Sequence, residues 1–337
     1  MKQLILTLII SVNASIAVAQ MDTCITNLKN AGTDYDQGDY DNAIVLLNNT
    51  MKGCPLSRED QLQASKLLIL CFLAIDDLEA ADNTAAAIMK IDPNFAPDKF
   101  KDDPKLSSLF KKYVPEPTLA VAVGGGMNWP VIDVVHTYSI VHADDAQGLA
   151  SYASQPGYQF GGEISKRIYK NLWGALGIQF RNTGYAHTLD SVQESTVHYE
   201  ENLTSFDFPL SIRYHFLSGP VNPYLQAGID FSFLSRALSS TTRDEEQDLV
   251  DRTAYRNNTS IGYFGEAGFQ YSIKALGIFG NFRYTWFPSF VNKEGTRYAD
   301  EINLYKYYYV DDDFKMNNIQ FNAGVFYILS YRISKVR

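Results

Sequence analysis

Strict alternation between apolar and polar side chains marks residues 206–216, which read Phe206-Asp207-Phe208-Pro209-Leu210-Ser211-Ile212-Arg213-Tyr214-His215-Phe216. The even-numbered residues are all large and apolar, whereas the odd-numbered residues include an aspartate, an arginine and a histidine. Successive side chains of a β-strand point to opposite faces, so this strand would have one apolar and one charged face. A single strand of a soluble sandwich would look the same, but several other segments repeat the pattern with Arg, Asp and Glu on the polar face. A charged interior inside an aromatic exterior is typical of a β-barrel surrounded by lipid.

The alternation predicts eight strands, at residues 119–126, 158–168, 172–181, 206–216, 224–233, 261–273, 278–286 and 319–333. The connections after the second, fourth and sixth strands are short turns, and the other connections are expected to be long loops of roughly fifteen to thirty residues. Bacterial outer-membrane barrels have an even number of strands, short periplasmic turns and long external loops. The first strand begins and the last strand finishes at the short-turn end, so a domain before the first strand is expected to lie in the periplasm.

The N-terminus predicts export. A short basic start at Lys2 precedes the apolar run Leu4 to Ile10, and Ala17-Val18-Ala19 offers a signal-peptidase site before Gln20. We therefore expect residues 1–19 to be a signal peptide. The longest later apolar run, Leu67 to Ile75, is too short to cross a bilayer as a helix. A membrane protein without such a helix has to be a barrel.

Composition agrees with this interpretation and excludes some partners. The 337 residues include 22 Tyr, 20 Phe and 22 Gly, as expected where aromatic rings form interfacial girdles. The formal net charge is −9, and loss of the signal peptide also removes Lys2. A chain this acidic is a poor partner, as a whole, for nucleic acid or for an anionic lipid surface.

Residues 20–114 are expected to form a separate helical domain. They contain no alternating run and follow the helical period instead. The turn that contains Tyr35, Gly38, Tyr40 and Ala43 resembles that of a tetratricopeptide repeat, in which a glycine ends one helix, an aromatic ring wedges into the hairpin and a small alanine lets two helices approach. A looser second copy runs from Ala64 to Pro93. A plain four-helix packing unit remains the alternative.

Other features complete this domain. A short helix within residues 103–113 is expected to cap the stack, because a lone repeat cannot bury its apolar face. Pro115-Glu116-Pro117 is a stiff linker, so the barrel is expected over residues 118–337.

Three cysteines remain after export. Cys24 starts the first expected helix and Cys54 follows the second, so an antiparallel helical hairpin would bring the two together as a disulfide. Cys71 lies in an apolar run and is expected to be a small core residue. No CxxC pair and no histidine lies near these thiols, so we expect them to bind no metal, and we expect no cofactor elsewhere.

A family resemblance rests on the stretch 206–216, on Asn222-Pro223-Tyr224 with Gly228 after it, and on Phe279-Gly280-Asn281-Phe282-Arg283-Tyr284. These motifs resemble the PorT-type outer-membrane β-barrel family over most of residues 118–334. The resemblance implies a small eight-stranded barrel similar to OmpA, and it implies a location more than an activity. One departure concerns the last residues: many such barrels finish on an aromatic residue, whereas this chain finishes on Val336-Arg337. An assembly signal would therefore lie upstream, around Tyr327 to Tyr331.

The charged residues of the polar faces are expected to meet inside the barrel as an ionic network: Glu163, Arg167, Arg181, Asp207, Arg213, Glu266 and Arg283. An eight-stranded barrel has an interior only wide enough for its own side chains. Charges there need partners, because desolvation is otherwise uncompensated. We therefore expect a plug rather than a pore or a catalytic site.

Other polar residues leave minor alternatives. Some small barrels act on lipid with Ser and His, but the spacing of His136, His142, His187, His198 and His215 indicates no triad. The runs Asp311-Asp312-Asp313 and Asp144-Asp145 could hold Ca²⁺, although solvated loop charge is the favoured interpretation. The run from Tyr305 to Tyr309 fits either a binding surface or a girdle strand.

Together these features predict an α+β multidomain protein: an all-α, tetratricopeptide-like domain followed by an eight-stranded antiparallel transmembrane β-barrel. The favoured function is a non-enzymatic scaffold or subunit of an envelope assembly for secretion, barrel insertion or nutrient uptake. Its expected partners are other envelope proteins, bound by the helical domain and by the external loops, and outer-membrane lipid, with no nucleic acid. The alternative is a standalone structural or adhesion barrel whose long loops bind extracellular ligands.

Overall fold

The computed structural model describes residues 23–98, 102–138, 150–192, 195–217, 219–243 and 246–335. The expected signal peptide, His142 and Asp144-Asp145 lie outside these residues. The chain forms two compact units. The helical unit comprises the chain up to Glu116 together with the segment that starts at Tyr331, and the barrel unit comprises Pro117–Ser330. The last residues, expected at the end of the barrel, therefore group with the helices.

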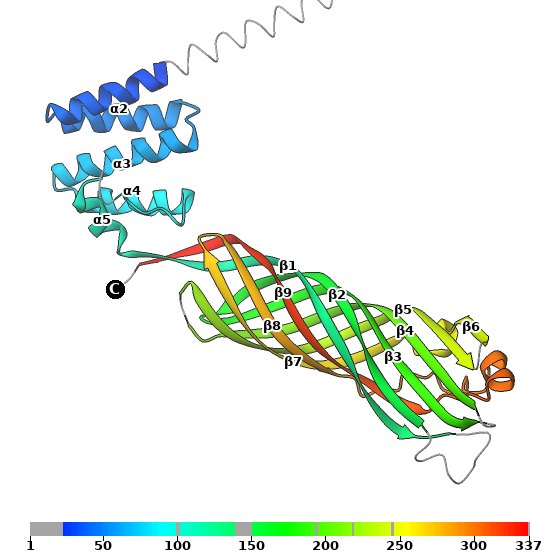
Figure 1. Cartoon of the computed structure of the whole chain (residues 1–337). Helices are drawn as coiled ribbons and strands as arrows, with labels where there is room; N and C mark the ends of the chain where they lie inside the picture. The colour runs from blue at the N-terminus through cyan, green and yellow to red at the C-terminus, as the bar shows by residue number, and fades with distance from the viewer. Residues whose placement is uncertain are drawn as a thin grey trace, which may run out of the picture. The chain divides into compact units, whose positions relative to one another are not determined.

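The helical unit is built from antiparallel helices that follow one another along the chain (Figure 1). A first helix covers the described residues 23–36, and the others are α2 (Tyr40–Gly53), α3 (Arg58–Ala74), α4 (Leu78–Ile91) and α5 (Pro104–Phe110). Carboxylate or hydroxyl side chains cap the N-termini: Asp39 accepts from the amide of Asn42, Ser57 from that of Asp60 and Asp77 from that of Ala80. Such caps satisfy amides that have no partner within the helix.

Small residues bring the first helices close together. Ala31, Ala43 and Leu47 are completely buried, in a cluster that also holds Cys71. The turn before α2 places Gly38 at φ 83°, a left-handed conformation that glycine adopts without steric cost, and the rings of Tyr35 and Tyr40 meet across it at 5.5 Å. Burial raises the pKa of the Cys71 thiol to about 11, which makes it an unreactive core residue.

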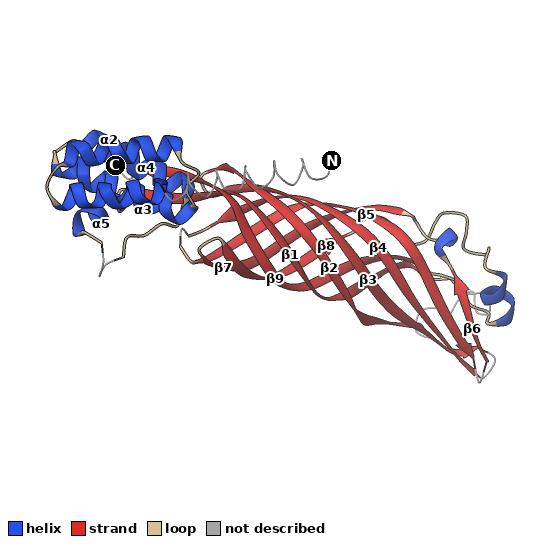
Figure 2. Cartoon of the chain, turned by 90° about the horizontal axis from the view of Figure 1, so that it is seen from above, coloured by secondary structure: helices blue, strands red, loops and turns tan. Residues whose placement is uncertain are grey.

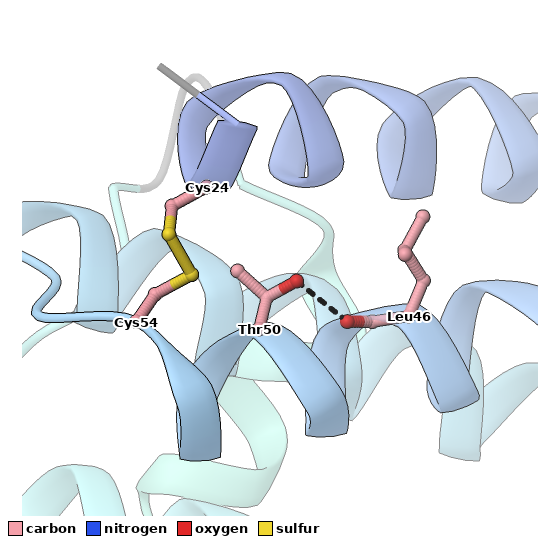
Figure 3. The surroundings of a disulfide bond; sticks show 4 residues. All are labelled: Cys24, Leu46, Thr50 and Cys54. Carbon is pink, nitrogen blue, oxygen red and sulfur yellow. Dashed lines mark hydrogen bonds between the residues drawn. A yellow bond between two sulfur atoms is a disulfide. The ribbon is translucent and has the colours of Figure 1, made fainter. Parts of the chain in front are cut away.

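A disulfide joins Cys24 to Cys54, the pairing expected from the sequence, with a Cα–Cα distance of 5.9 Å (Figure 3). Next to it, the Thr50 hydroxyl donates to the Leu46 carbonyl at 2.7 Å. The bond spans 30 residues, so chain entropy alone would stabilise the unit by about 3 to 4 kcal/mol. A second cluster joins α3, α4 and α5 through Ile69, Ile88 and Leu106. Within the described residues, no helix is both long and apolar enough to cross a membrane.

The barrel unit is a closed ring of antiparallel strands (Figure 2). The strands are β1 (Tyr113–His136), β2 (Ala150–Tyr169), β3 (Leu172–Val192), β4 (Ser195–His215), β5 (Val221–Arg243), β6 (Glu246–Asp251), β7 (Thr259–Ile273), β8 (Leu276–Trp286) and β9 (Asp313–Lys335). The sheet runs β4-β3-β2-β1-β9-β8-β7-β5, and pairing of β4 with β5 closes it into an eight-stranded ring. The short β6 pairs with β5 and lies outside this ring.

The polar faces of the strands point inward, as the alternation predicts. Along residues 206–216 the six even-numbered side chains are 37 to 56 % exposed, whereas Asp207 is 0 % and Arg213 is 6 % exposed. Ile178, Leu225 and Phe321 continue this exposed apolar belt on other strands. We call the end with the β2–β3, β4–β5 and β7–β8 turns the turn end, and the opposite end the loop end.

The expectation of four long loops is wrong for the third connection. The third and fourth strands extend well past the apolar belt, because β3 continues to Val192 and β4 begins at Ser195. Residues 182–189 and 197–204, expected as loop, are paired strand arms. Their inward faces hold Tyr185, His187 and Glu201, and this polar, aromatic composition resembles that of a loop. The hairpin between β5 and β6 was likewise not expected.

Candidate functional site: the barrel interior and its loop-end cap

Three buried ion pairs fill the interior within the apolar belt. Arg181 Nε lies 2.6 Å from Asp207, Arg213 Nη2 2.6 Å from Glu163 and Arg283 Nη2 2.7 Å from Glu266, so these six residues of the predicted network come together. Each guanidinium also lies over an aromatic ring: Phe287 for Arg181, Tyr224 for Arg213 and Phe264 for Arg283. Loss of one partner would leave a buried charge unpaired, at a cost of about 3–5 kcal/mol.

Arg167 lies elsewhere. It is half-buried at the turn end, where its Nε donates to the carbonyl of Lys170 in the β2–β3 turn. This hydrogen bond ties Arg167 to the β2–β3 turn, and its membership of the lumen network stays a prediction.

A chain of side-chain amides connects the ion pairs to the seam between the first and last strands. Asn128 Nδ2 donates to Gln159 Oε1 at 2.8 Å, and Gln159 Nε2 donates to Asn322 Oδ1 at 2.7 Å. The chain continues from Asn322 to Asn281 at 2.9 Å and from Asn281 to the Tyr224 hydroxyl, which donates to Glu266 at 3.0 Å. The sequence placed several of these amides on the polar face, but their spacing gave no sign that they form one chain.

Asp230 is the one lumen carboxylate whose two oxygens both lack a hydrogen-bond partner within the described residues. It is 1 % exposed, on β5 between Pro209 of β4 and Gly262 of β7. Neither neighbour has a side chain that donates a hydrogen bond, which explains the missing partner. The alternation along β5 could have predicted that Asp230 faces inward, since it lies on the same face of the strand as Gln226.

The interior is divided into small cavities. One of about 80 Å³ lies beside Glu163, Arg213 and Glu266, and another of about 60 Å³ lies between Arg181 and Arg256. Each has room for a few water molecules. Together with the ion pairs, these small volumes show that side chains fill much of the interior.

A second ionic cluster, the loop-end cap, lies beyond the apolar belt. Arg256 is completely buried and lies 2.5 Å from Glu201 and 2.8 Å from Asp311. Arg252 lies 2.5 Å from the same Asp311 and 3.4 Å from Asp300. The arginines lie between β6 and β7, the aspartates between β8 and β9, and Glu201 on β4. The cap therefore ties both long connections to the barrel wall.

Aromatic rings surround these charges. The rings of Tyr199 and Tyr309 stack at 4.3 Å, and the hydroxyls of Tyr185 and Tyr199 donate to Glu201 at 2.5 and 2.8 Å. Burial alone would raise the pKa of Asp311, but the guanidiniums of Arg256 and Arg252 outweigh it and lower this pKa to about 2. Asp311 is therefore ionised at neutral pH, as the cap requires.

Two interpretations of the last long connection are corrected by this arrangement. Asp311 and Asp312 are 2 % exposed, so they are not solvated loop charge. Tyr307 and Tyr309 are buried in the cap rather than in a girdle strand, and only Tyr305, at 72 %, is widely exposed. The sequence could not reveal this, because the partners come from irregular segments without a period.

The histidines lie apart from one another. His187 is buried, with Nδ1 3.2 Å from the Tyr309 hydroxyl and Nε2 3.9 Å from Asp312. His136 lies near Asp313, His198 beside Thr188, and His215 against Trp173 at the turn end. Among the residues that the structure describes, no three His, Cys, Asp or Glu side chains gather in a way that could hold a metal ion.

Comparison with known proteins agrees with this architecture. A family model described as "Outer membrane protein beta-barrel domain" matches residues 117–290, just over half of the chain. The chain belongs to this outer-membrane β-barrel family. The outer membrane is therefore its location, and the apolar belt is the surface that meets lipid. None of the curated proteins compared with the chain matches it.

Solved outer-membrane barrels resemble the chain at low identity. Neisserial surface protein A is 14 % identical with a TM-score of 0.33, and the match covers 63 % of this chain and 97 % of that one. OprG from Pseudomonas aeruginosa is 14 % identical with a TM-score of 0.36, covering 63 % and 96 %. Ail, the attachment invasion locus protein of Yersinia pestis, is 10 % identical with a TM-score of 0.28, covering 63 % and 99 %.

Proposed function

We propose that the protein is a non-enzymatic outer-membrane anchor that holds its helical unit in the periplasm as a protein-binding subunit of an envelope assembly. The observation that carries this proposal is topological. The chain enters β1 and leaves β9 at the turn end, which in bacterial barrels faces the periplasm. The filled interior supports an anchoring role, since the residues that the structure describes there form neither a channel nor a recognisable set of catalytic groups.

Features of the helical unit support protein binding. Its first turn, with Gly38 at positive φ, Tyr40 against Tyr35 and the buried Ala43, has the pattern of a tetratricopeptide hairpin. Two apolar side chains remain exposed at the α3–α4 turn, Ile75 at 42 % and Leu78 at 61 %. Exposed apolar residues on a repeat surface are typical contacts for a partner peptide or helix.

Cross-linking with mass spectrometry on intact envelopes tests the proposal. We expect cross-links from the helical unit to other envelope proteins, and we expect the Ile75→Asp/Leu78→Asp variant to lose them. Asn83→Asp, on the exposed surface of α4, is the matched control because it adds charge without removing apolar surface. A native protein that purifies alone in mild detergent at natural abundance would contradict the scaffold role.

A second candidate, an adhesion barrel, is favoured by the loop-end cap. The cap fixes the long connections, so exposed residues such as Leu249, at 78 %, and Tyr305 are held on a rigid support. Deletion of residues 22–114 separates the candidates: a scaffold loses its partners, whereas an adhesin keeps ligand binding through its loops.

The absence of enzymatic activity is also a proposal. Alanine replacement of His136, His142, His187 and His198 should leave the lipid profile of the membrane unchanged. A changed profile would favour a lipid-modifying enzyme instead.

A further inference from the structure

The charged residues at the turn end of the barrel unit are all basic. They are Lys166, Arg167, Lys170 and Lys274, and no Asp or Glu occurs among the described residues of that end, 117–121, 164–173, 214–217, 219–224, 270–278 and 326–330. Glu116, near the start of β1, is the neighbouring acidic residue, and it groups with the helical unit. At the loop end both signs occur together, as in the cap. A chain with a net charge of −9 thus has one locally cationic rim.

Two of these lysines occupy strained backbone positions. Lys170 has φ 40° in the β2–β3 turn, and Lys274 has φ 59° in the β7–β8 turn. Glycine adopts this left-handed region without the clash that a Cβ causes. Two of the three short connections therefore carry a lysine where glycine would cost less, which indicates that the side chain itself has a role.

The lysines lie at the border of the lipid-facing belt. Lys166 is exposed on the outer face of β2, between Ile164 at 46 % and Ile168 at 63 %. Lys170 Nζ lies 5.3 Å from the ring centre of Tyr169, which is itself 65 % exposed, and Lys274 follows Ile273, which is 64 % exposed. Such side chains bury their stems in the hydrocarbon border and extend the ammonium group to the headgroup layer.

We propose that Lys166, Lys170 and Lys274, here named the turn-end collar, form a binding surface for the headgroup phosphates of anionic phospholipids. The occupant follows from position and charge. The collar continues the apolar belt, so acyl chains already lie beside it, and its ammonium groups are compact charges suited to phosphate. The net negative charge of the whole chain disfavours binding to anionic surfaces in general. A lipid headgroup, however, contacts only the rim, where the charged side chains are basic.

The test measures lipid binding to the full chain in mild detergent, by native mass spectrometry and by thermal stabilisation on addition of phosphatidylglycerol or phosphatidylcholine. We expect a clear preference for phosphatidylglycerol. Each basic side chain near an anionic surface contributes about fivefold, so the Lys166→Gln/Lys170→Gly variant should weaken that binding by about thirtyfold. Lys274→Gly should weaken it by about fivefold.

The variants also separate binding from folding. Glycine relieves the left-handed strain at positions 170 and 274, so these variants should unfold at the same or a higher temperature without lipid. Lys293→Gln, at an exposed loop-end lysine, is the matched control and should keep the preference. Equal binding of both lipids by the native chain, an equal loss in the Lys293→Gln control, or equal stabilisation by inorganic phosphate alone would overturn the proposal.

Discussion

Arg256 shows at the scale of one residue how the loop end is held. Its guanidinium contacts Glu201 on β4 and both Asn292 and Asp311 in the connection between β8 and β9. A buried arginine stabilises a fold only when its donors are satisfied, and here carboxylate and hydroxyl oxygens supply the acceptors. The cap therefore depends on the ionised form of its aspartate.

Acidification should loosen the cap through Asp311. The pKa of this carboxyl is about 2 in the fold and near 3.8 otherwise, so the folded state favours the charged form. Its contribution, about 2 kcal/mol, is fully present above about pH 4 and is lost as the pH falls toward 2. Hydrogen exchange in residues 246–312, corrected for the intrinsic effect of pH, should show protection that falls over this window. The Asp311→Asn variant should lack most of this pH dependence. Protection in the native chain that stays constant down to pH 2 would contradict the prediction.

Residue parity explains which interior groups the sequence could predict. Strict alternation along a strand makes inward-facing charges predictable, because apolar residues on either side show which face is which. This holds for Arg181, Asp207, Arg213 and Glu266. Arg252 and Arg256 follow no period, and only the closed topology brings them to Asp311. The sequence could give the composition of the interior but not the partners of its irregular segments.

At the scale of elements, the first helical hairpin depends on one glycine. Gly38→Ala should lower the stability of the helical unit by about 1 kcal/mol, since an added Cβ is strained at φ 83° although no atom lies within 4 Å of it. Gly53→Ala is the control: it also meets open space, but it lies within α2, so alanine should be neutral or slightly stabilising. Chemical denaturation followed by the helical circular dichroism signal measures both, and equal losses would refute the role of the turn.

The seam between β1 and β9 is the element that closes the ring. A Cβ on Gly126 would lie 1.7 Å from the Phe321 carbonyl oxygen, so the strands approach closely there. Gln159 joins the seam by bonding Asn322 and the Met127 carbonyl. Gln159→Leu should lower the unfolding temperature, because it leaves buried amide groups unpaired at about 1–3 kcal/mol. Heat-dependent gel mobility measures this unfolding temperature. The exposed Gln247→Leu should have little effect in that assay, and similar shifts in the two variants would argue against a stabilising role of Gln159 at the seam.

Element lengths were harder to predict than element existence. The eight ring strands follow from the apolar belt, because lipid imposes strict alternation there. Beyond the belt, water replaces lipid and the outer faces of β3 and β4 no longer need to be apolar, so the pattern ends before the strands do. Residues 182–189 and 197–204 are the clearest case.

At the scale of the whole molecule, the chain ends where its helices are. Ile333 packs against the cluster of Leu106 and Phe110, Lys335 pairs with Asp82, and the Tyr331 hydroxyl accepts from Asn94 at 3.4 Å. The hydrogen bond from Lys335 lowers the pKa of Asp82. The helical unit is therefore completed by residues that are synthesised after the entire barrel, and no periodic pattern in the sequence indicates this.

This dependence predicts a long-range effect. Ile333→Ala with Lys335→Gln should destabilise the helical unit by about 1–2 kcal/mol, mainly through lost apolar burial with a small share from the exposed ion pair. The neighbouring Arg332→Gln, at an exposed position, should have no effect. Denaturation followed by the helical signal measures the loss, while the heat-dependent mobility of the barrel should stay unchanged because the substitutions lie outside Pro117–Ser330. If the helical signal were equally stable in both variants, the last strand would end in the helical unit without stabilising it, and the N-terminal residues alone would be sufficient for its fold.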